Sequence, residues 1–232
     1  MMEMRQGGGF ATLTPENLLG PLNDVEQKYA PARLFVAGPM EIPLPSPRVS
    51  IVGSRKASEN GLEAAREIAK YLVREETIIV SGLAEGIDSA AHTSAMQNGG
   101  RTIAVIATPL DRSYPANNSG LQERISREHL VISQFEIGKR VLKQNFIFRN
   151  RTMALISNAT VIVEAKDDSG SLHQGWEALR LGRPLFIWRD VLDDPSVKVP
   201  QDMLNYGAMR LNELEEILPS LPQSESFLEI VQ

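Results

Sequence analysis

The sequence has no cysteine and only three histidines among its 232 residues. The lack of cysteine excludes disulfides, thiolate metal sites and cysteine nucleophiles, and it is compatible with a reducing compartment. The histidines are scattered without the spacing of metal ligands, so we expect no metal. No apolar run approaches the roughly 20 residues of a membrane span, and residues 1–10 lack a signal-peptide core. We therefore expect a cytoplasmic protein with no membrane contact.

An excess of positive charge is also lacking. The chain has 24 basic and 29 acidic side chains, and its net charge is -5. A polyanionic ligand would therefore have to be met by a local cationic patch, because the surface as a whole is not basic. Hydrophobic residues make up 42% of the chain, which can supply the substantial core of one α/β domain.

Three parts are expected along the chain. Residues 1–47 are predicted to form a tail through residue 12, a short helix, a strand and a connector whose four prolines oppose regular structure. Residues 48–218 are predicted to form the main domain. Residues 219–232 are expected to form a loose tail or a docking segment.

From residue 48 onward, short apolar runs alternate with amphipathic stretches. This pattern is typical of a mostly parallel sheet with helices on both faces, so the predicted fold class is a doubly wound α/β sheet. Strands are expected at about 49–53, 77–80, 102–107, 129–135, 160–165, 185–188 and 208–211, and helices at about 62–73, 88–98, 119–127, 145–157 and 172–181. Ligands of such sheets bind outside the carboxyl ends of the strands, so the loops that follow the strands are the candidate site.

Two glycine turns follow the first two of these strands. Gly53-Ser54-Arg55 leads from a strand into a helix, and the segment from Ser81-Gly82 to Asp88 repeats this design. Helix N-termini present unpaired N–H groups and the positive end of a dipole, so these turns are predicted to accept phosphate, with Arg55 closing over it. The alternative is that the glycines only permit tight turns and close helix packing.

A cationic segment lies at residues 139–151. It contains Lys139, Arg140, Lys143, Arg149 and Arg151 and no acidic residue. Most such runs are solvated helix faces. Here two phenylalanines at 146 and 148 alternate with the cations, and aromatic faces stack on bases while Lys and Arg neutralise phosphates. Arg149 is the strongest ligand candidate because it lies early in a predicted helix at the same edge of the sheet.

Other polar residues allow two interpretations. Ser169-Gly170-Ser171 opens a predicted helix and either binds an anion or only caps the helix. Asp88 is explained by capping, and His92 by packing. Glu164 and Glu177 could act in acid/base chemistry, but no Ser-His-Asp order or paired-carboxylate spacing is present. The residues alone therefore favour binding of a phosphorylated ligand over catalysis.

Several ordered motifs resemble the DNA-processing protein A family (DprA, also called Smf). They are Gly53-Ser-Arg55, Ser81 to Asp88 with Ala91-His92, Gly99 to Ala104, Leu110-Asp-Arg-Ser-Tyr-Pro115 with Asn118, Asn145-Phe146 with Arg149-Asn-Arg151, and Glu164-Ala165 with Ser169-Gly-Ser-Leu172. The resemblance implies an extended Rossmann-like domain that binds single-stranded DNA in a basic pocket, forms a homodimer and passes the strand to the RecA recombinase during natural transformation. The residues then expected to contact DNA are Gly53, Ser54, Arg55, Ser81, Gly82, Lys143, Asn145, Phe146, Arg149, Asn150, Arg151, Ser169, Gly170 and Ser171.

The chain also departs from that family. Many members add an N-terminal helical domain and a C-terminal winged helix, for which we expect no room here. The segment His173-Gln-Gly-Trp-Glu177 replaces the usual Thr and small residues.

A second family offers an alternative function. The LOG-type nucleotide phosphoribohydrolases resemble this chain at Arg149 and Glu177, although Asn150 replaces their lysine and Ser169 to Leu172 replaces their glycine loop. A nucleotide-sensing module is a third possibility. The favoured interpretation is a single-stranded-DNA-binding protein with no cofactor and no chemistry of its own.

Overall fold

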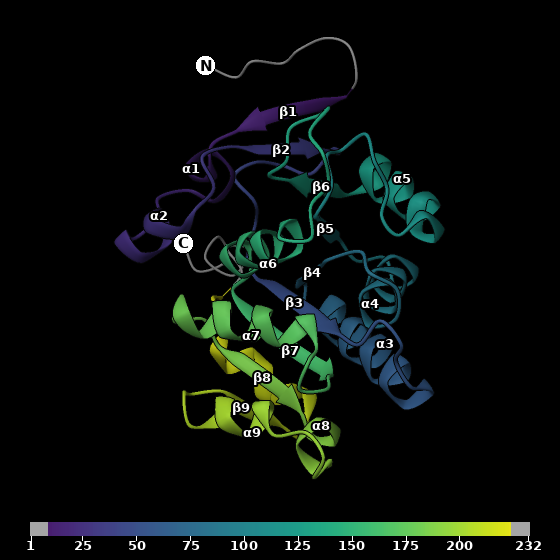
Figure 1. Cartoon of the computed structure of the whole chain (residues 1–232), viewed down its shortest axis with the longest axis vertical. Coiled ribbons are helices and arrows are strands. Elements are labelled where there is room, and N and C mark those ends of the chain that lie inside the picture. Colours follow the sequence, from purple (N-terminus) through teal and green to yellow (C-terminus); the bar gives the residue numbers. More distant parts are fainter. Residues whose placement is uncertain (1–8, 224–232) are drawn as a thin grey trace, which may run out of the picture.

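The structure, a computed structural model, describes residues 9–223 as one long sheet flanked by helices (Figure 1). The strands are β1 (Phe10–Leu13), β2 (Leu34–Ala37), β3 (Arg48–Gly53), β4 (Ile78–Ser81), β5 (Thr102–Ile106), β6 (Leu130–Ser133), β7 (Ala159–Glu164), β8 (Leu185–Trp188) and β9 (Met209–Leu211). The α-helices are α1 (Pro15–Leu19), α2 (Asp24–Tyr29), α3 (Glu59–Arg74), α4 (Ile87–Gln97), α5 (Ser119–Glu128), α6 (Asn145–Ile156), α7 (Gly170–Arg180), α8 (Arg189–Asp193) and α9 (Val199–Leu204). Two 3-10 helices, η1 (Ala116–Asn118) and η2 (Leu214–Ser220), complete the described chain.

The strands have the order β1-β2-β6-β5-β4-β3-β7-β8-β9. All neighbours from β6 to β9 pair in parallel, whereas β1 and β2 are antiparallel additions at one end. Strands β4, β5 and β6 extend the sheet on one side of β3, and β7, β8 and β9 extend it on the other. The winding therefore reverses between β3 and β7, which makes their carboxyl ends the topological switch point where open α/β sheets bind ligands. The predicted fold class is confirmed.

Each face of the sheet packs against its own set of helices. Val49 and Ile51 of β3 pack with α3, α4 and η2, while Val52 packs with α6 and α7 on the opposite face. Residues of β3 are buried on both faces, which explains why its apolar residues Val49, Ile51 and Val52 face both sides of the sheet and none alternates with an exposed polar residue. The loops that emerge from the carboxyl ends are thereby held on a rigid support.

The N-terminal region differs from its prediction. Phe10–Leu13, of which residues 10–12 were predicted to belong to a tail, forms β1 and pairs in register with Leu34–Ala37. This region thus adds two strands to the same sheet, β1 from the predicted tail and β2 at the predicted strand, and Thr14 caps α1. Residues 1–8 and 224–232 of the predicted tails lie outside the described residues. Within residues 9–223, no helix has both the length and the apolar character required to cross a membrane.

Candidate functional site

A cavity of about 500 Å³ opens at the switch point. We call it the switch-point cavity; the β3–α3 loop, helix α6 and the β7–α7 loop form its walls together with Ala84 and Asp88 of the segment after β4. It contains nine of the residues predicted from the sequence: Gly53, Ser54, Arg55, Phe146, Arg149, Asn150, Ser169, Gly170 and Ser171. Segments more than 100 residues apart in the chain therefore meet in one space.

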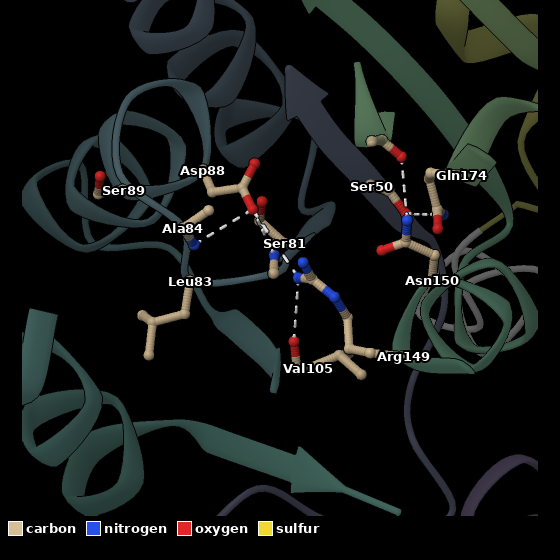
Figure 2. A network of polar contacts seen from close by, with 12 residues as sticks. Ser50, Ser81, Leu83, Ala84, Asp88, Ser89, Val105, Arg149, Asn150 and Gln174 are labelled. Atoms are coloured by element: carbon tan, nitrogen blue, oxygen red, sulfur yellow. Dashed lines mark hydrogen bonds and ion pairs between the residues drawn. The ribbon is translucent and has the colours of Figure 1, made fainter. Parts of the chain in front are cut away.

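Arg149 is the buried cation of this cavity. Its side chain is only 7% exposed, and its Nη1 donates to the carbonyl oxygen of Val105 at 3.3 Å and lies 3.9 Å from Asp88 Oδ2 (Figure 2). Burial lowers the pKa of Arg149, while the nearby Asp88 carboxylate opposes that shift. Its Nε, also buried, has no hydrogen-bond partner in the described part of the chain. A buried donor without a partner costs stability, so this nitrogen is available to a ligand.

The loop after β4 is built to hold Arg149. A Cβ atom on Gly82 would lie 1.2 Å from Arg149 Nη1, so only glycine leaves room for the guanidinium. The backbone N–H groups of Gly82 and Ala84 donate to the Asp88 carboxylate at 3.1 and 3.3 Å. Burial raises the pKa of Asp88, and Arg149 and these N–H donors oppose the rise. Two of the N–H groups that were predicted to accept phosphate are therefore already bound by the protein's own carboxylate.

The turn after β3 is open to the cavity. Ser54 Oγ accepts a hydrogen bond from the backbone N–H of Lys56 at 3.2 Å, and the side chains of Arg55 and Lys56 are exposed. The Arg55 guanidinium lies 5.4 Å from the ring centroid of Phe146, and the Phe146 and Tyr114 rings pack in a T-shaped arrangement with their centroids 5.3 Å apart. A cation and an aromatic ring therefore line the cavity together, and Tyr114 packs beside them.

The loop after β7 forms the opposite wall. Ser169 Oγ accepts from the backbone N–H of Lys166 at 2.8 Å, and α7 begins at Gly170. The first N–H groups of a helix have no partner within it and face incoming ligands. Ser171 Oγ is buried without a hydrogen-bond partner among residues 9–223, and Asn150 Nδ2 donates to the Gly170 carbonyl oxygen at 3.0 Å, which ties α6 to α7. This arrangement favours an anion at the start of α7.

Several predicted contacts lie elsewhere. Ser81 Oγ is buried and donates to the Ile51 carbonyl oxygen at 2.6 Å, and Asn145 Nδ2 donates to that of Ala107 at 3.2 Å. Gly82 packs against Arg149 and does not line the cavity. Lys143 is exposed and precedes α6.

Arg151 points away from Arg149. The two residues are two positions apart, or about 200° around a helix. Arg151 Nε donates to Glu177 Oε1 at 3.0 Å, and Glu177 also pairs with Arg180. Glu177 does not line the switch-point cavity, so the Arg149–Glu177 pair of the phosphoribohydrolase alternative is not brought together.

Sequence reasoning missed several residues of the cavity. Lys56 and Lys166 add two cations to its lining, while Asp168 adds an exposed carboxylate and Asp88 a buried one. The position of Lys56 next to Arg55, and that of Lys166 directly after a strand, were the available signals. Glu164 caps the start of α3 by accepting from Ser58 Oγ at 2.6 Å. Within residues 9–223 no cluster of three His, Asp or Glu residues could hold a metal ion.

His92 is packed, as expected. Its ring is fully buried, and Nδ1 lies 2.7 Å from Thr102 Oγ1. Burial, His129 and Arg149 lower the pKa of His92 to about 3, so the ring is neutral at physiological pH.

Comparison with known proteins agrees with this geometry. The model of a protein family described as DNA recombination-mediator protein A matches residues 15–222. The chain belongs to this family. The resemblance inferred from the motifs is thereby confirmed, and the phosphoribohydrolase alternative is not favoured.

Two relatives named DprA align with most of this chain. DNA processing protein DprA of Streptococcus pneumoniae is 44% identical over 164 residues, which are 70% of this chain and 57% of the relative. The DprA of Bacillus subtilis is 33% identical over 193 residues, which are 83% of this chain and 65% of the relative. The chain thus spans less than two thirds of the length of these two relatives.

Solved structures of the family have the same architecture. The crystal structure of DprA from S. pneumoniae superposes with a TM-score of 0.77 at 34% identity, covering 92% of this chain and 75% of that one. A structure of DprA from Helicobacter pylori, described as giving insight into its single-stranded DNA binding mode, has a TM-score of 0.76 at 25% identity and covers 91% of this chain and 94% of that one.

Proposed function

We propose that this chain binds single-stranded DNA in the switch-point cavity and acts in DNA processing and recombination without a reaction of its own. The observation that carries the proposal is the buried Arg149, whose Nε lacks a partner in the described chain and which lines the same cavity as Arg55, Lys56 and Lys166. The family membership and the H. pylori structure support the choice of DNA as the polyanion.

The groups of the cavity have separate roles in this proposal. One backbone phosphate sits at the start of α7, where Arg149 Nε and Ser171 Oγ donate to it. Such charge-assisted hydrogen bonds are about twice as strong as neutral ones. Arg55, Lys56 and Lys166 neutralise neighbouring phosphates at the mouth. A base stacks on Phe146 beside Tyr114, an interaction worth about 1–3 kcal/mol per base and tolerant of sequence.

A salt titration tests this function. Fluorescence anisotropy of a labelled oligothymidylate should give an observed association constant that falls with salt at a log–log slope of about -3, because each of four neutralised phosphates contributes about -0.7. Arg55→Ala and Lys166→Ala should each reduce the slope by about 0.7 and weaken binding. Arg124→Ala is the control, since Arg124 lies on α5 and pairs with Glu128 outside the cavity.

A binding titration with AMP in place of the oligonucleotide separates the alternative functions. A nucleotide-sensing module would bind AMP as tightly as the oligonucleotide, and that result would refute the DNA proposal. Release of free base from AMP, absent in Glu177→Ala, would instead support the phosphoribohydrolase alternative.

Partners and location complete the proposal. In line with the family, we propose a cytoplasmic homodimer that assists loading of a RecA-type recombinase. Light scattering should then give about twice the chain mass of 25.6 kDa, and the protein should accelerate recombinase assembly on single-stranded DNA.

A further inference from the structure

A second cavity, of about 450 Å³, lies between helices α3 and α4. We call it the α3–α4 groove. The residues of its lining that matter here are Arg55, Lys56 and Arg66 on one side and Ser89, Thr93 and Gln97 on the other. Figure 1 shows the two helices side by side along one edge of the molecule. None of the residues predicted from the sequence lies in it except Arg55.

The groove is continuous with the switch-point cavity. Arg55 and Lys56 line both spaces, so the two openings meet at these side chains. Gly86 lies at the end of the groove and has a φ of +76°. Its backbone lies so close to the β3–α3 loop that a Cβ atom would be 2.3 Å from the Ser54 carbonyl oxygen. The two loops are thus packed against each other, and a chain leaving the cavity over Arg55 reaches the groove directly.

The lining of the groove matches a sugar–phosphate backbone. It contains three cations and, within the described part of the chain, no carboxylate, although the protein has a net charge of -5. Ser89, Thr93 and Gln97 recur every four residues and therefore form one polar row along α4, about 12 Å long. Hydroxyl and amide groups in such a row donate to phosphate and sugar oxygens, which position a strand without reading its sequence.

Arg66 is free to exchange its present partner for a phosphate. It pairs with Glu63 at 2.8 Å, but their side chains are 44% and 62% exposed. Exposed pairs of this kind contribute little, typically about 0–1 kcal/mol. A phosphate offers Arg66 charge-assisted, bidentate hydrogen bonds and releases counterions on binding.

We propose that the α3–α4 groove is a second binding site for the sugar–phosphate backbone, which holds the part of a single strand that leaves the switch-point cavity over Arg55. This proposal rests on the proposed function, because the cavity must hold the first part of the strand. It predicts that Arg66 contacts only strands long enough to extend beyond the cavity.

Oligothymidylates of about 4 and about 12 nucleotides test the proposal. A longer strand gains affinity in every variant because it offers more registers, so the measured quantity is the affinity of each variant relative to wild type at the same length. Arg66→Ala should weaken the longer strand about fivefold and lower its salt slope by about 0.7, while sparing the short one. Thr93→Glu, which places a carboxylate in the groove, should have the same length-dependent effect, and Glu63→Gln should strengthen binding of the longer strand.

Lys70→Ala is the matched control. Lys70 also lies on α3 and pairs with a glutamate three residues away, Glu67, at 3.6 Å, but it does not line the groove. Lys70→Ala should leave the affinity for the short strand and for the longer strand unchanged. An Arg66→Ala effect of equal size at both lengths, or no effect at either, overturns the groove while leaving the cavity as the DNA site. Failure of the wild-type protein to bind either strand refutes the proposed function as well.

Discussion

The turns after β3 and β4 look alike in sequence and differ in the structure. Both leave a buried strand through a Ser-Gly or Gly-Ser pair and enter a helix on the same face of the sheet. The β3 turn exposes Arg55 and Lys56 to the cavity, whereas the N–H groups of the β4 turn are filled by Asp88, at 3.1 and 3.3 Å. We call the β3 turn open because its exposed cations face the cavity, and the β4 turn closed because Gly82 and Asp88 enclose the buried Arg149.

In both turns a carboxylate of the protein accepts hydrogen bonds from backbone N–H groups, since Glu164 accepts from Ser58 at 3.0 Å before α3 as Asp88 does in the β4 turn. Backbone N–H groups at a helix start attract any carboxylate within reach, including one from the same helix. Asp88 satisfies them in the β4 turn, and the turn then serves a different purpose, because Gly82 and Asp88 together hold Arg149. The closed turn supports the buried cation, and the open turn supplies the exposed ones.

Breaking the closed turn should have the largest effect. Arg149→Ala leaves Asp88 buried without its cation, and loss of one partner of a buried pair costs about 3–5 kcal/mol. Urea denaturation should show this loss, together with loss of DNA binding. The double variant Asp88→Asn with Arg149→Gln should recover much of the stability but not the binding. A loss below about 1 kcal/mol in Arg149→Ala would show that the pair does not support the turn.

The sequence predicted the fold and the convergence of loops better than it predicted individual contacts. The alternation of apolar and amphipathic stretches from residue 48 reflects the doubly wound sheet, and the ends of β3 and β7 follow from it. The sequence could not show that Asp88 folds back onto the N–H groups of Gly82, because this depends on the geometry of one loop.

The cationic segment illustrates the same limit. Arg149 and Arg151 belong to one charge run, yet the helix sends Arg151 to Glu177 on a neighbouring helix. Likewise β1 was missed because four residues at an edge gain their order from pairing with β2, a partner that is distant in the sequence. In both cases tertiary contacts decided the outcome.

A methyl group at residue 82 should also break the closed turn. In Gly82→Ala the new Cβ would overlap Arg149 Nη1, so the guanidinium must move; overpacking of this kind costs about 1–3 kcal/mol. Thermal denaturation and anisotropy should both register the change. Gly120→Ala is the control, because its Cβ would meet nothing within 4 Å. Wild-type DNA affinity in Gly82→Ala would mean that the position of Arg149 is not critical.

Acid should weaken the closed turn through His92, which lies one turn after Asp88 on α4. The folded-state pKa of His92 is about 3, whereas the unfolded value is near 6.5, so below pH 6.5 only the unfolded chain takes up this proton. Its contribution lowers stability by about 1.4 kcal/mol per pH unit between pH 6.5 and 3. Asp88, with its raised pKa, contributes in the opposite direction.

Denaturation of His92→Gln across this pH range isolates the histidine contribution. His92→Gln should lose the histidine contribution to the slope of stability against pH. Arg55→Ala, in the open turn, should retain the wild-type dependence of stability on pH. If the free energy of unfolding falls equally with pH in wild type and His92→Gln, this histidine is not held neutral in the folded protein.

The two serines give the finest test of the comparison. Ser81→Ala removes a buried hydrogen bond of 2.6 Å to the Ile51 carbonyl oxygen and should cost about 1 kcal/mol of stability while leaving DNA affinity unchanged. Ser54→Ala removes the 3.2 Å bond from the Lys56 N–H in the open turn, which orders Arg55 and Lys56. It should weaken DNA binding about twofold with a change in stability within about 0.5 kcal/mol. A loss of stability alone in Ser81→Ala and a loss of affinity alone in Ser54→Ala would show that the β4 turn is structural and that the β3 turn binds DNA. Similar effects in both variants would contradict this difference.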